Sequence, residues 1–138
     1  MLSSPYLQSP VFDKNEKPPK RILLVDDDLL VRGCMRRYLE GQGYHCTEAD
    51  NGAMALNTLA NRTFSLIITD NQMPVMDGIT FLETLYARQQ GSTPVIIVTG
   101  RVTSSLTQRA HHIGITSIIE KPCTLGILSE AIVESIEA

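Results

Sequence analysis

Short apolar runs and helical periodicities alternate along this chain. Four continuous apolar runs, each bounded by polar or turn residues, predict buried strands at 22–25, 66–68, 95–98 and 118–119. A fifth and weaker strand, with polar alternation, is predicted at 44–48, as is typical of the edge of a sheet.

The stretches between these runs repeat apolar residues at the spacing of an α-helix. The first stretch has five of them on one helical face, before glycines that end the helix: Val31, Cys34, Met35, Tyr38 and Leu39. Further helices are predicted to begin near residues 51, 78, 103 and 125. Five alternations of strand and helix predict an α/β fold, in which a doubly wound five-stranded parallel sheet carries helices on both faces.

The chain divides into two parts. Residues 1–19 hold four prolines among serines and charges, which predicts a flexible N-terminal arm or linker. Residues 20–138 have the regular pattern and enough length for one domain with a real core. The last helix uses up the chain, so we expect no output domain.

Composition narrows the class of protein. Hydrophobic residues make up 43% of the chain and charged residues 20%, as in a globular protein. A net charge of -3 argues against direct binding of nucleic acid or an anionic membrane, and no apolar run has the length of a membrane span. The three cysteines, Cys34, Cys46 and Cys123, lie in apolar patterns, which predicts buried free thiols in a reducing cytoplasm.

Polar groups follow four of the predicted strands. Asp26 and Asp27 follow the first strand, Asp70 the third, Thr99 the fourth and Lys121 the fifth. In a doubly wound sheet these ends converge on one crevice. Carboxylates a few ångströms apart repel by about 4 kcal/mol at an effective dielectric of 20, and Mg²⁺ would relieve that repulsion. With a hydroxyl and an ammonium to hold phosphoryl oxygens, the set predicts phosphoryl transfer onto a carboxylate.

Each of these residues taken alone has a simpler explanation. Asp27 or Asp28 could cap the first helix, and the pair Asp77-Gly78 could form a turn. Thr99 could be an ordinary strand-end residue and Lys121 a solvated charge. Four groups at the matching ends of four strands are nevertheless hard to attribute to caps and turns, so together they indicate a functional site.

The same stretches resemble a known family. The motifs LLVDD at 23–27, IITDNQMP at 67–74 with MDG at 76–78, PVIIVT at 94–99 and EKP at 120–122 together look like the CheY-like receiver domain of two-component response regulators. The resemblance begins at about residue 20 and reaches the C-terminus. It implies a flavodoxin-like fold with strand order 2-1-3-4-5.

The resemblance also implies a metal site and an acceptor. Asp70 would be the phosphoacceptor, taking a phosphoryl group from a histidine of a sensor kinase or of a phosphotransfer protein. Mg²⁺ would be ligated by Asp27, Asp70 and the backbone carbonyl of Gln72, with Asp26 acting largely through a bound water. Such a domain is a signalling phosphoacceptor rather than an enzyme, capable at most of self-phosphorylation from small donors and self-dephosphorylation.

Other roles follow from the same resemblance. Thr99 would donate a hydrogen bond to the phosphoryl group, Lys121 would pair with it, and the peptide bond before Pro122 is expected to be cis. Many receivers have an aromatic residue where this chain has Ile118, so the activation signal would be smaller or carried otherwise. Gln72 and Arg101 occupy the positions that tune the lifetime of the phosphoryl group.

Three other functions compete with this interpretation. An aspartyl-phosphate hydrolase of the haloacid dehalogenase type requires a second aspartate two residues after the first, where this chain has Gln72. A nucleotide- or flavin-binding module requires a glycine-rich loop after the first strand, where this chain has three aspartates. A receiver that has lost phosphorylation and serves for docking would not need the complete set of site residues.

The context and the partners stay open. The chain is either a free-standing regulator or a receiver cut from a hybrid kinase or a longer regulator, and we expect a monomer or a weak dimer. Its output surface would be the face formed by residues 103–136. Arg32, Arg36 and Arg37 on the first helix either dock the kinase or phosphotransfer protein or form a solvated helix face.

Overall fold

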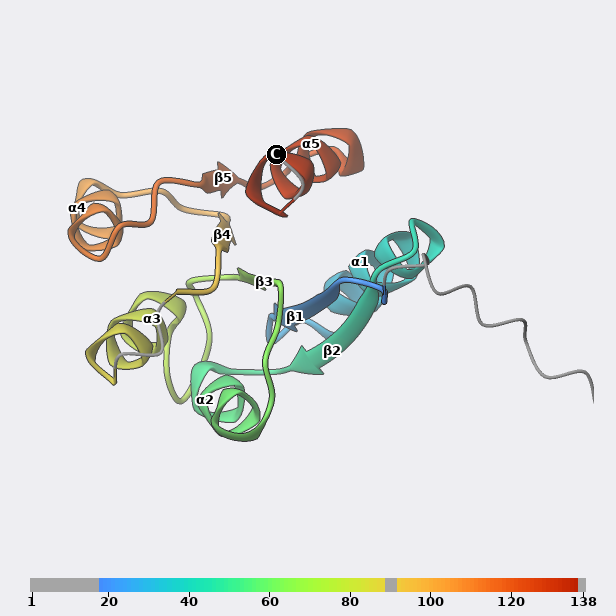
Figure 1. Cartoon of the computed structure of the whole chain (residues 1–138). Helices are drawn as coiled ribbons and strands as arrows, with labels where there is room; N and C mark the ends of the chain where they lie inside the picture. Colours follow the sequence, from blue (N-terminus) through green and yellow to red (C-terminus); the bar gives the residue numbers. More distant parts are fainter. Residues whose placement is uncertain (1–17, 89–91, 137–138) are drawn as a thin grey trace, which may run out of the picture.

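Five strands alternate with five helices in the computed structural model, which describes residues 18–88 and 92–136 (Figure 1). The strands are β1 (Arg21–Val25), β2 (His45–Ala49), β3 (Leu66–Thr69), β4 (Val95–Thr99) and β5 (Ile118–Glu120). The helices are α1 (Leu29–Gly41), α2 (Gly52–Asn61), α3 (Gly78–Ala87), α4 (Ser104–His112) and α5 (Leu125–Ile136). The predicted arm at 1–19 lies almost entirely outside the described residues, so that boundary stays a prediction.

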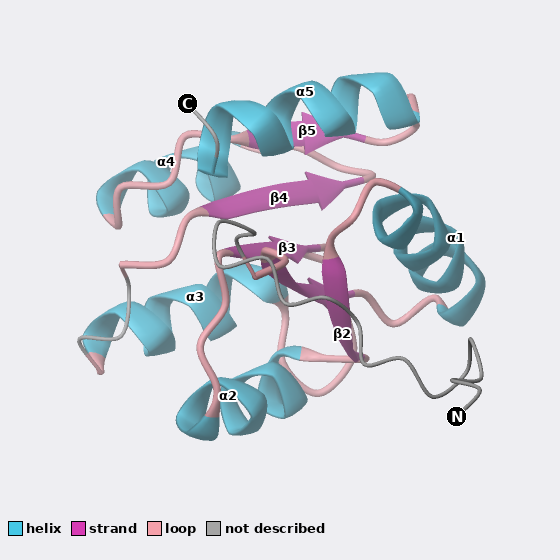
Figure 2. Ribbon diagram, turned by 45° about the vertical axis from the view of Figure 1, so that its right-hand side comes forward, coloured by secondary structure: helices cyan, strands magenta, loops and turns pink. Residues whose placement is uncertain are grey.

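The strands form one parallel sheet in the order β2-β1-β3-β4-β5, as predicted. Helices α1 and α5 cover one face of the sheet, and α2, α3 and α4 cover the other (Figures 1 and 2). Because all strands run the same way, their carboxyl ends meet at one edge of the sheet. This is the doubly wound, flavodoxin-like fold, and the order reverses next to β1, between β1 and β3.

Alternation along the strands divides the apolar interior into two cores. In β1, Leu23 and Val25 point into the core under α2, α3 and α4, while Ile22 and Leu24 point into the core under α1 and α5. Both faces of the central strands are thus buried, which explains why they are continuous apolar runs. These two cores fix the strand ends where the site is built.

The first helix differs from its predicted packing. Among its residues only Leu39 is fully buried, and both Val31 and Cys34 are exposed. Val31 and Cys34 line an open groove between α1 and α5 instead of packing inside a core. The prediction of three buried thiols is therefore wrong for Cys34, while Cys123 is half-buried and Cys46 is buried, which raises the pKa of its thiol to about 11.

No helix in the described part of the chain combines the length and the apolar character needed to cross a bilayer.

Candidate functional site

Asp26 and Asp70 extend directly from the ends of β1 and β3. The amide of Asp26 donates to the carbonyl of Ala49 at 3.1 Å, and the amide of Asp70 donates to the carbonyl of Val25 at 2.8 Å. The sheet's hydrogen bonding therefore continues one step past the strands and holds both aspartates on rigid backbone. Their side chains are largely buried, with Asp70 at 8% exposure.

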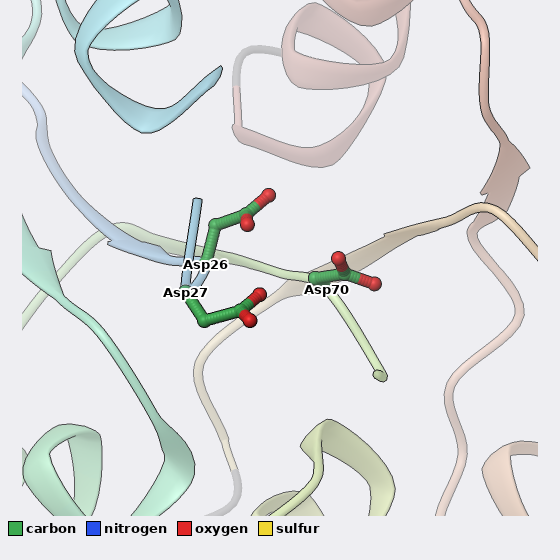
Figure 3. A group of neighbouring side chains, drawn as sticks. All are labelled: Asp26, Asp27 and Asp70. Atoms are coloured by element: carbon green, nitrogen blue, oxygen red, sulfur yellow. The ribbon is translucent and has the colours of Figure 1, made fainter. Parts of the chain in front are cut away.

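Three carboxylates converge at this edge. One oxygen from each of Asp26, Asp27 and Asp70, the acidic cluster, lies within 4.8 Å of the others (Figure 3). Asp28 rather than Asp27 caps α1, accepting hydrogen bonds from the amides of the second and third helical residues, so Asp27 can face the cluster. Hard carboxylate oxygens at this separation fit Mg²⁺, and the exposed Asp27 gives the ion a path from solvent.

Lys121 bridges two members of the acidic cluster. Its Nζ donates to Oδ2 of Asp26 and to Oδ2 of Asp70, each at 3.0 Å. Burial lowers the pKa of Lys121, but the hydrogen bonds and charges of the two carboxylates outweigh burial, so its pKa lies above the ordinary value. The ammonium stays charged and partly neutralises the cluster. The peptide bond to Pro122 is cis, as expected.

Thr99 ends β4 beside Lys121. The amide of Lys121 donates to the carbonyl of Thr99 at 2.8 Å, which keeps the two residues together. The hydroxyl Oγ1 of Thr99 is fully buried and has no hydrogen-bond partner among the residues that the structure describes. A buried hydroxyl without a partner is destabilising by about 1–3 kcal/mol, which suits a donor reserved for an arriving oxygen.

The loop after Asp70 is tightly folded against its own start. A Cβ on Gly78 would lie 2.2 Å from the carbonyl oxygen of Asp70, so only glycine fits there. Asp77, which was predicted only as part of a turn, caps α3 by accepting from the amide of Thr80 at 2.9 Å. The amide of Gln72 donates to Oδ1 of Asp70 at 3.2 Å, which orients the carboxylate.

The structure brings together the predicted groups from three separate stretches of sequence, namely Asp26 and Asp27, Asp70, and Lys121. Metal ligation by the carbonyl of Gln72 stays a prediction, and so does the tuning role expected of Gln72 and of Arg101, which is exposed.

The contacts that two arginines of α1 make beside the site were not predicted from the sequence. Arg32 donates from Nη1 to the carbonyl of Asp26 at 2.6 Å and from Nε to Glu48 at 2.7 Å. Arg36 also donates to Glu48, at 2.7 Å. These two arginines hold α1 to β2, so neither belongs to a merely solvated face. No local signal reveals this, because Glu48 lies in another element.

An apolar groove beside the site was not predicted. It has a volume of about 540 Å³, lies between the start of α1 and the start of α5, and is lined in part by Lys121. Its α1 wall consists of Leu30, Val31, Cys34 and Met35. Leu30 is 79% exposed and lies with the exposed Val31 and Leu125 in this groove, so the exposed apolar surface is a patch rather than a single residue. Three of the five periodic apolar residues of α1, namely Val31, Cys34 and Met35, therefore line this groove.

Comparisons with known proteins agree with this geometry. Residues 22–133 match the family model described as the response regulator receiver domain. The chain is 35% identical over 112 residues to the sensor histidine kinase RcsC of Salmonella typhimurium, a match that covers 80% of this chain and 12% of the kinase. It is 52% identical over 60 residues to the response regulator receiver protein CpdR of Brucella abortus, covering 44% of this chain and 50% of CpdR.

The fold is similar to solved structures as well. A CheY-like response regulator receiver domain protein from Methanospirillum hungatei superposes with a TM-score of 0.82 at 29% identity, covering 86% of this chain and 94% of that one. The chain spans half or less of the length of the two curated relatives described here.

Proposed function

This chain belongs to the family of response regulator receiver domains, and on that premise we propose that Asp70 is its phosphoacceptor in a Mg²⁺-dependent reaction. The observation that carries the proposal is the contact of Lys121 Nζ with both Asp70 and Asp26 at 3.0 Å. An ammonium held between an acceptor carboxylate and a second acid is placed to neutralise the charge that a phosphoryl group adds.

The transfer forms one bond and breaks another. A carboxylate oxygen of Asp70 attacks the phosphorus of a donor phosphohistidine, and the bond from phosphorus to the histidine nitrogen breaks. The electron pair of that bond stays on the imidazole, which takes up a proton from solvent. Mg²⁺ held by Asp27, Asp70 and the carbonyl of Gln72, with Asp26 acting through a water, would offset the phosphoryl charge.

The signal would leave the site through Thr99. Its partnerless hydroxyl would donate to a phosphoryl oxygen, and its carbonyl is already bound to the amide of Lys121 at the end of β5. Ile118 in β5 is half-buried and packs against the core that holds Leu106 and Ala110 of α4. An aliphatic contact of this kind replaces the aromatic switch and would carry the change to the face formed by residues 103–136, where a target protein binds.

The phosphodonor would dock on the apolar groove. Lys121 lines the groove and also contacts Asp70, so a protein seated in the groove would lie close to the acceptor. Exposed apolar side chains on the first turns of α1 suit the apolar face of a donor helix. Arg32 and Arg36 are engaged by Glu48, which favours an apolar docking surface over the basic one considered from the sequence. The donor is a sensor histidine kinase or a phosphotransfer protein in the cytoplasm.

The competing enzymatic function lacks support at the acceptor loop. A hydrolase of the haloacid dehalogenase type needs an acid/base two residues after the acceptor, and Gln72 has no titratable group. A receiver used only for docking also lacks support, because it would have no use for the buried Thr99 hydroxyl that has no hydrogen-bond partner.

The test uses a small phosphodonor. The protein is incubated with Mg²⁺ and acetyl phosphate, and its intact mass is measured beside Asp70→Asn and Asp77→Asn. We expect the gain of one phosphoryl group in the wild type and in Asp77→Asn, since asparagine still caps α3, and no gain in Asp70→Asn. Equal gain in Asp70→Asn would overturn the assignment of the acceptor.

A further inference from the structure

Arg32 joins two elements beside the acidic cluster. Its Nη1 donates to the backbone carbonyl of Asp26 at 2.6 Å, and its Nε donates to Oε1 of Glu48 on β2 at 2.7 Å. The side chain is only 12% exposed. A planar guanidinium holds two acceptors in fixed directions at once, which a lysine ammonium does not.

The carbonyl that Arg32 binds belongs to the peptide between Asp26 and Asp27. Because a peptide group is planar, its orientation sets the direction in which Asp27 leaves the strand. The amide of Asp26 is already bound to Ala49 of β2. The turn after β1 is therefore attached to β2 on both sides of Asp26, directly at the amide and through Arg32 at the carbonyl.

Glu48 in turn orients Arg32. Its second oxygen, Oε2, accepts from Nη1 of Arg36 at 2.7 Å. The hydrogen bond from Arg36 and, more weakly, that from Arg32 outweigh burial and hold the pKa of Glu48 below its ordinary value. A charged Glu48 thus fixes both arginines, but only Arg32 reaches the backbone of the acidic cluster.

We propose that Arg32 is a positioning residue for divalent-cation binding, which fixes the peptide between Asp26 and Asp27 so that Asp27 faces Asp70. Glu48 supports it from β2. This inference rests on the proposed function, since the cation it serves is the one required for phosphorylation. No ligand atom comes from Arg32 itself.

The charge of Arg32 and its proposed positioning role predict opposite effects on Mg²⁺ binding when Arg32 is removed. Arg32 is a cation near three carboxylates, so by Coulomb attraction alone its removal strengthens Mg²⁺ binding. If Arg32 positions Asp27, its removal weakens Mg²⁺ binding, because the ligands are no longer held together. The sign of the change therefore separates a positioning role from a purely electrostatic one.

The experiment is a Mg²⁺ titration of the unphosphorylated protein, followed by amide chemical shifts, for the wild type, Arg32→Met, Arg32→Lys and Arg36→Met. We expect Arg32→Met to weaken Mg²⁺ binding by about 10- to 100-fold, the usual effect of losing a group that orients a ligand. Arg32→Lys should fall between it and the wild type. Arg36→Met removes the other arginine that pairs with Glu48 but leaves the contact of Arg32 with Asp26 in place. This variant should bind Mg²⁺ as tightly as the wild type or slightly more tightly.

A second readout uses acetyl phosphate. The phosphorylation rate of Arg32→Met should approach the wild-type rate at saturating Mg²⁺, because the acceptor itself is intact. If Arg32→Met does not fold, Arg32→Lys supplies the comparison. Equal or tighter Mg²⁺ binding in the Arg32 variants, or an equal loss in Arg36→Met, overturns the inference alone. A wild type that binds no Mg²⁺ overturns the proposed function and this inference together.

Discussion

Two cations reach the acidic cluster from opposite edges of the sheet, and they hold it in different ways. Arg32, oriented by β2, binds the backbone carbonyl of Asp26. Lys121, which follows β5, binds carboxylate oxygens of Asp26 and Asp70. The backbone carbonyl of Asp26 takes no part in the proposed reaction, so its contact with Arg32 can persist throughout. The carboxylate oxygens that Lys121 contacts are the atoms to which a metal ion and a phosphoryl group would bind. On the proposals above, one edge of the sheet fixes the site, and the other would adjust when the site is occupied.

The β2 edge of the sheet is also held more firmly to its neighbouring helix than the β5 side is. On the β2 edge Glu48 binds two arginines of α1, and the Arg32 side chain is largely buried. On the β5 side the strand has three residues, none fully buried, and α4 is tied to α3 by the more exposed pair Glu83–Arg109. Regions with few buried contacts open at lower free energy, so a response to phosphorylation is expected on the β5 side.

The largest effect is expected when the contacts of Lys121 with Asp26 and Asp70 are removed. In Lys121→Met the phosphorylation rate from acetyl phosphate should fall by about 100-fold or more, because a donor to the developing charge is lost. Mg²⁺ binding should become tighter, since three carboxylates lose their counter-charge. This rise is opposite in sign to the loss expected for Arg32→Met.

The matched control for this variant is Lys20→Met, an exposed lysine just before β1, which should change neither quantity. Weaker Mg²⁺ binding in Lys121→Met would contradict the comparison, since both cations would then act as fixed supports.

The next effect tests how rigidly Asp70 is held. In Gly78→Ala the new Cβ meets the backbone carbonyl of Asp70, and we expect a loss of stability of about 2 kcal/mol with slower phosphorylation. The control is Gly33→Ala in α1, where a Cβ meets nothing within 4 Å and should stabilise by about 0.5–1 kcal/mol. Urea unfolding measures both changes, and an unchanged Gly78→Ala would show that the loop has room to move.

A smaller effect concerns the partnerless hydroxyl on the adjustable side. Thr99→Val should leave stability unchanged or raise it by up to about 1 kcal/mol, because a buried polar atom without a partner is removed. Phosphorylation of the variant should produce smaller amide shifts in β5 and α4. Thr103→Val, by contrast, removes the cap of α4 and should lose about 1 kcal/mol. A clear destabilisation of Thr99→Val would mean that its hydroxyl is already satisfied.

The smallest effect compares Glu48 with Glu83 as pH falls. The hydrogen bond from Arg109 holds the pKa of Glu83 below its ordinary value of 4.5, as Arg36 and Arg32 do for Glu48. A lowered pKa means that each pair stabilises the fold above pH 4.5 and that this stability is lost as pH falls through the value in the folded protein. The Glu83 pair is exposed and screened, so it should contribute about 0.5 kcal/mol.

Urea unfolding of Glu48→Gln and Glu83→Gln at neutral and acidic pH checks this difference. Both variants should approach the wild type in acid. Glu48→Gln should be the less stable of the two at neutral pH, and added salt should reduce only the effect at Glu83. Equal effects at both positions would remove the distinction between the edges.

The sequence by itself determined the architecture and indicated which polar groups lie together at one edge of the sheet. The apolar runs gave the central strands within a residue or so, because strands buried on both faces have little choice of residue type. The polar groups at 26, 27, 70, 99 and 121 were placed at one edge, since the carboxyl ends of parallel strands must meet there. These features follow from local pattern and from topology, and neither requires knowledge of a particular contact.

Only the tertiary structure decided which side chains face one another at the margins of the sheet. The alternatives for Asp27 and Asp28 were resolved when Asp28 was found to cap α1. Arg32 and Arg36 both pair with Glu48 of β2, a contact that the sequence did not predict. Val31 and Cys34 are exposed, although their periodicity predicted an inward face. A helical pattern shows which residues share a face, but the position of the helix relative to the end of the sheet decides what that face meets.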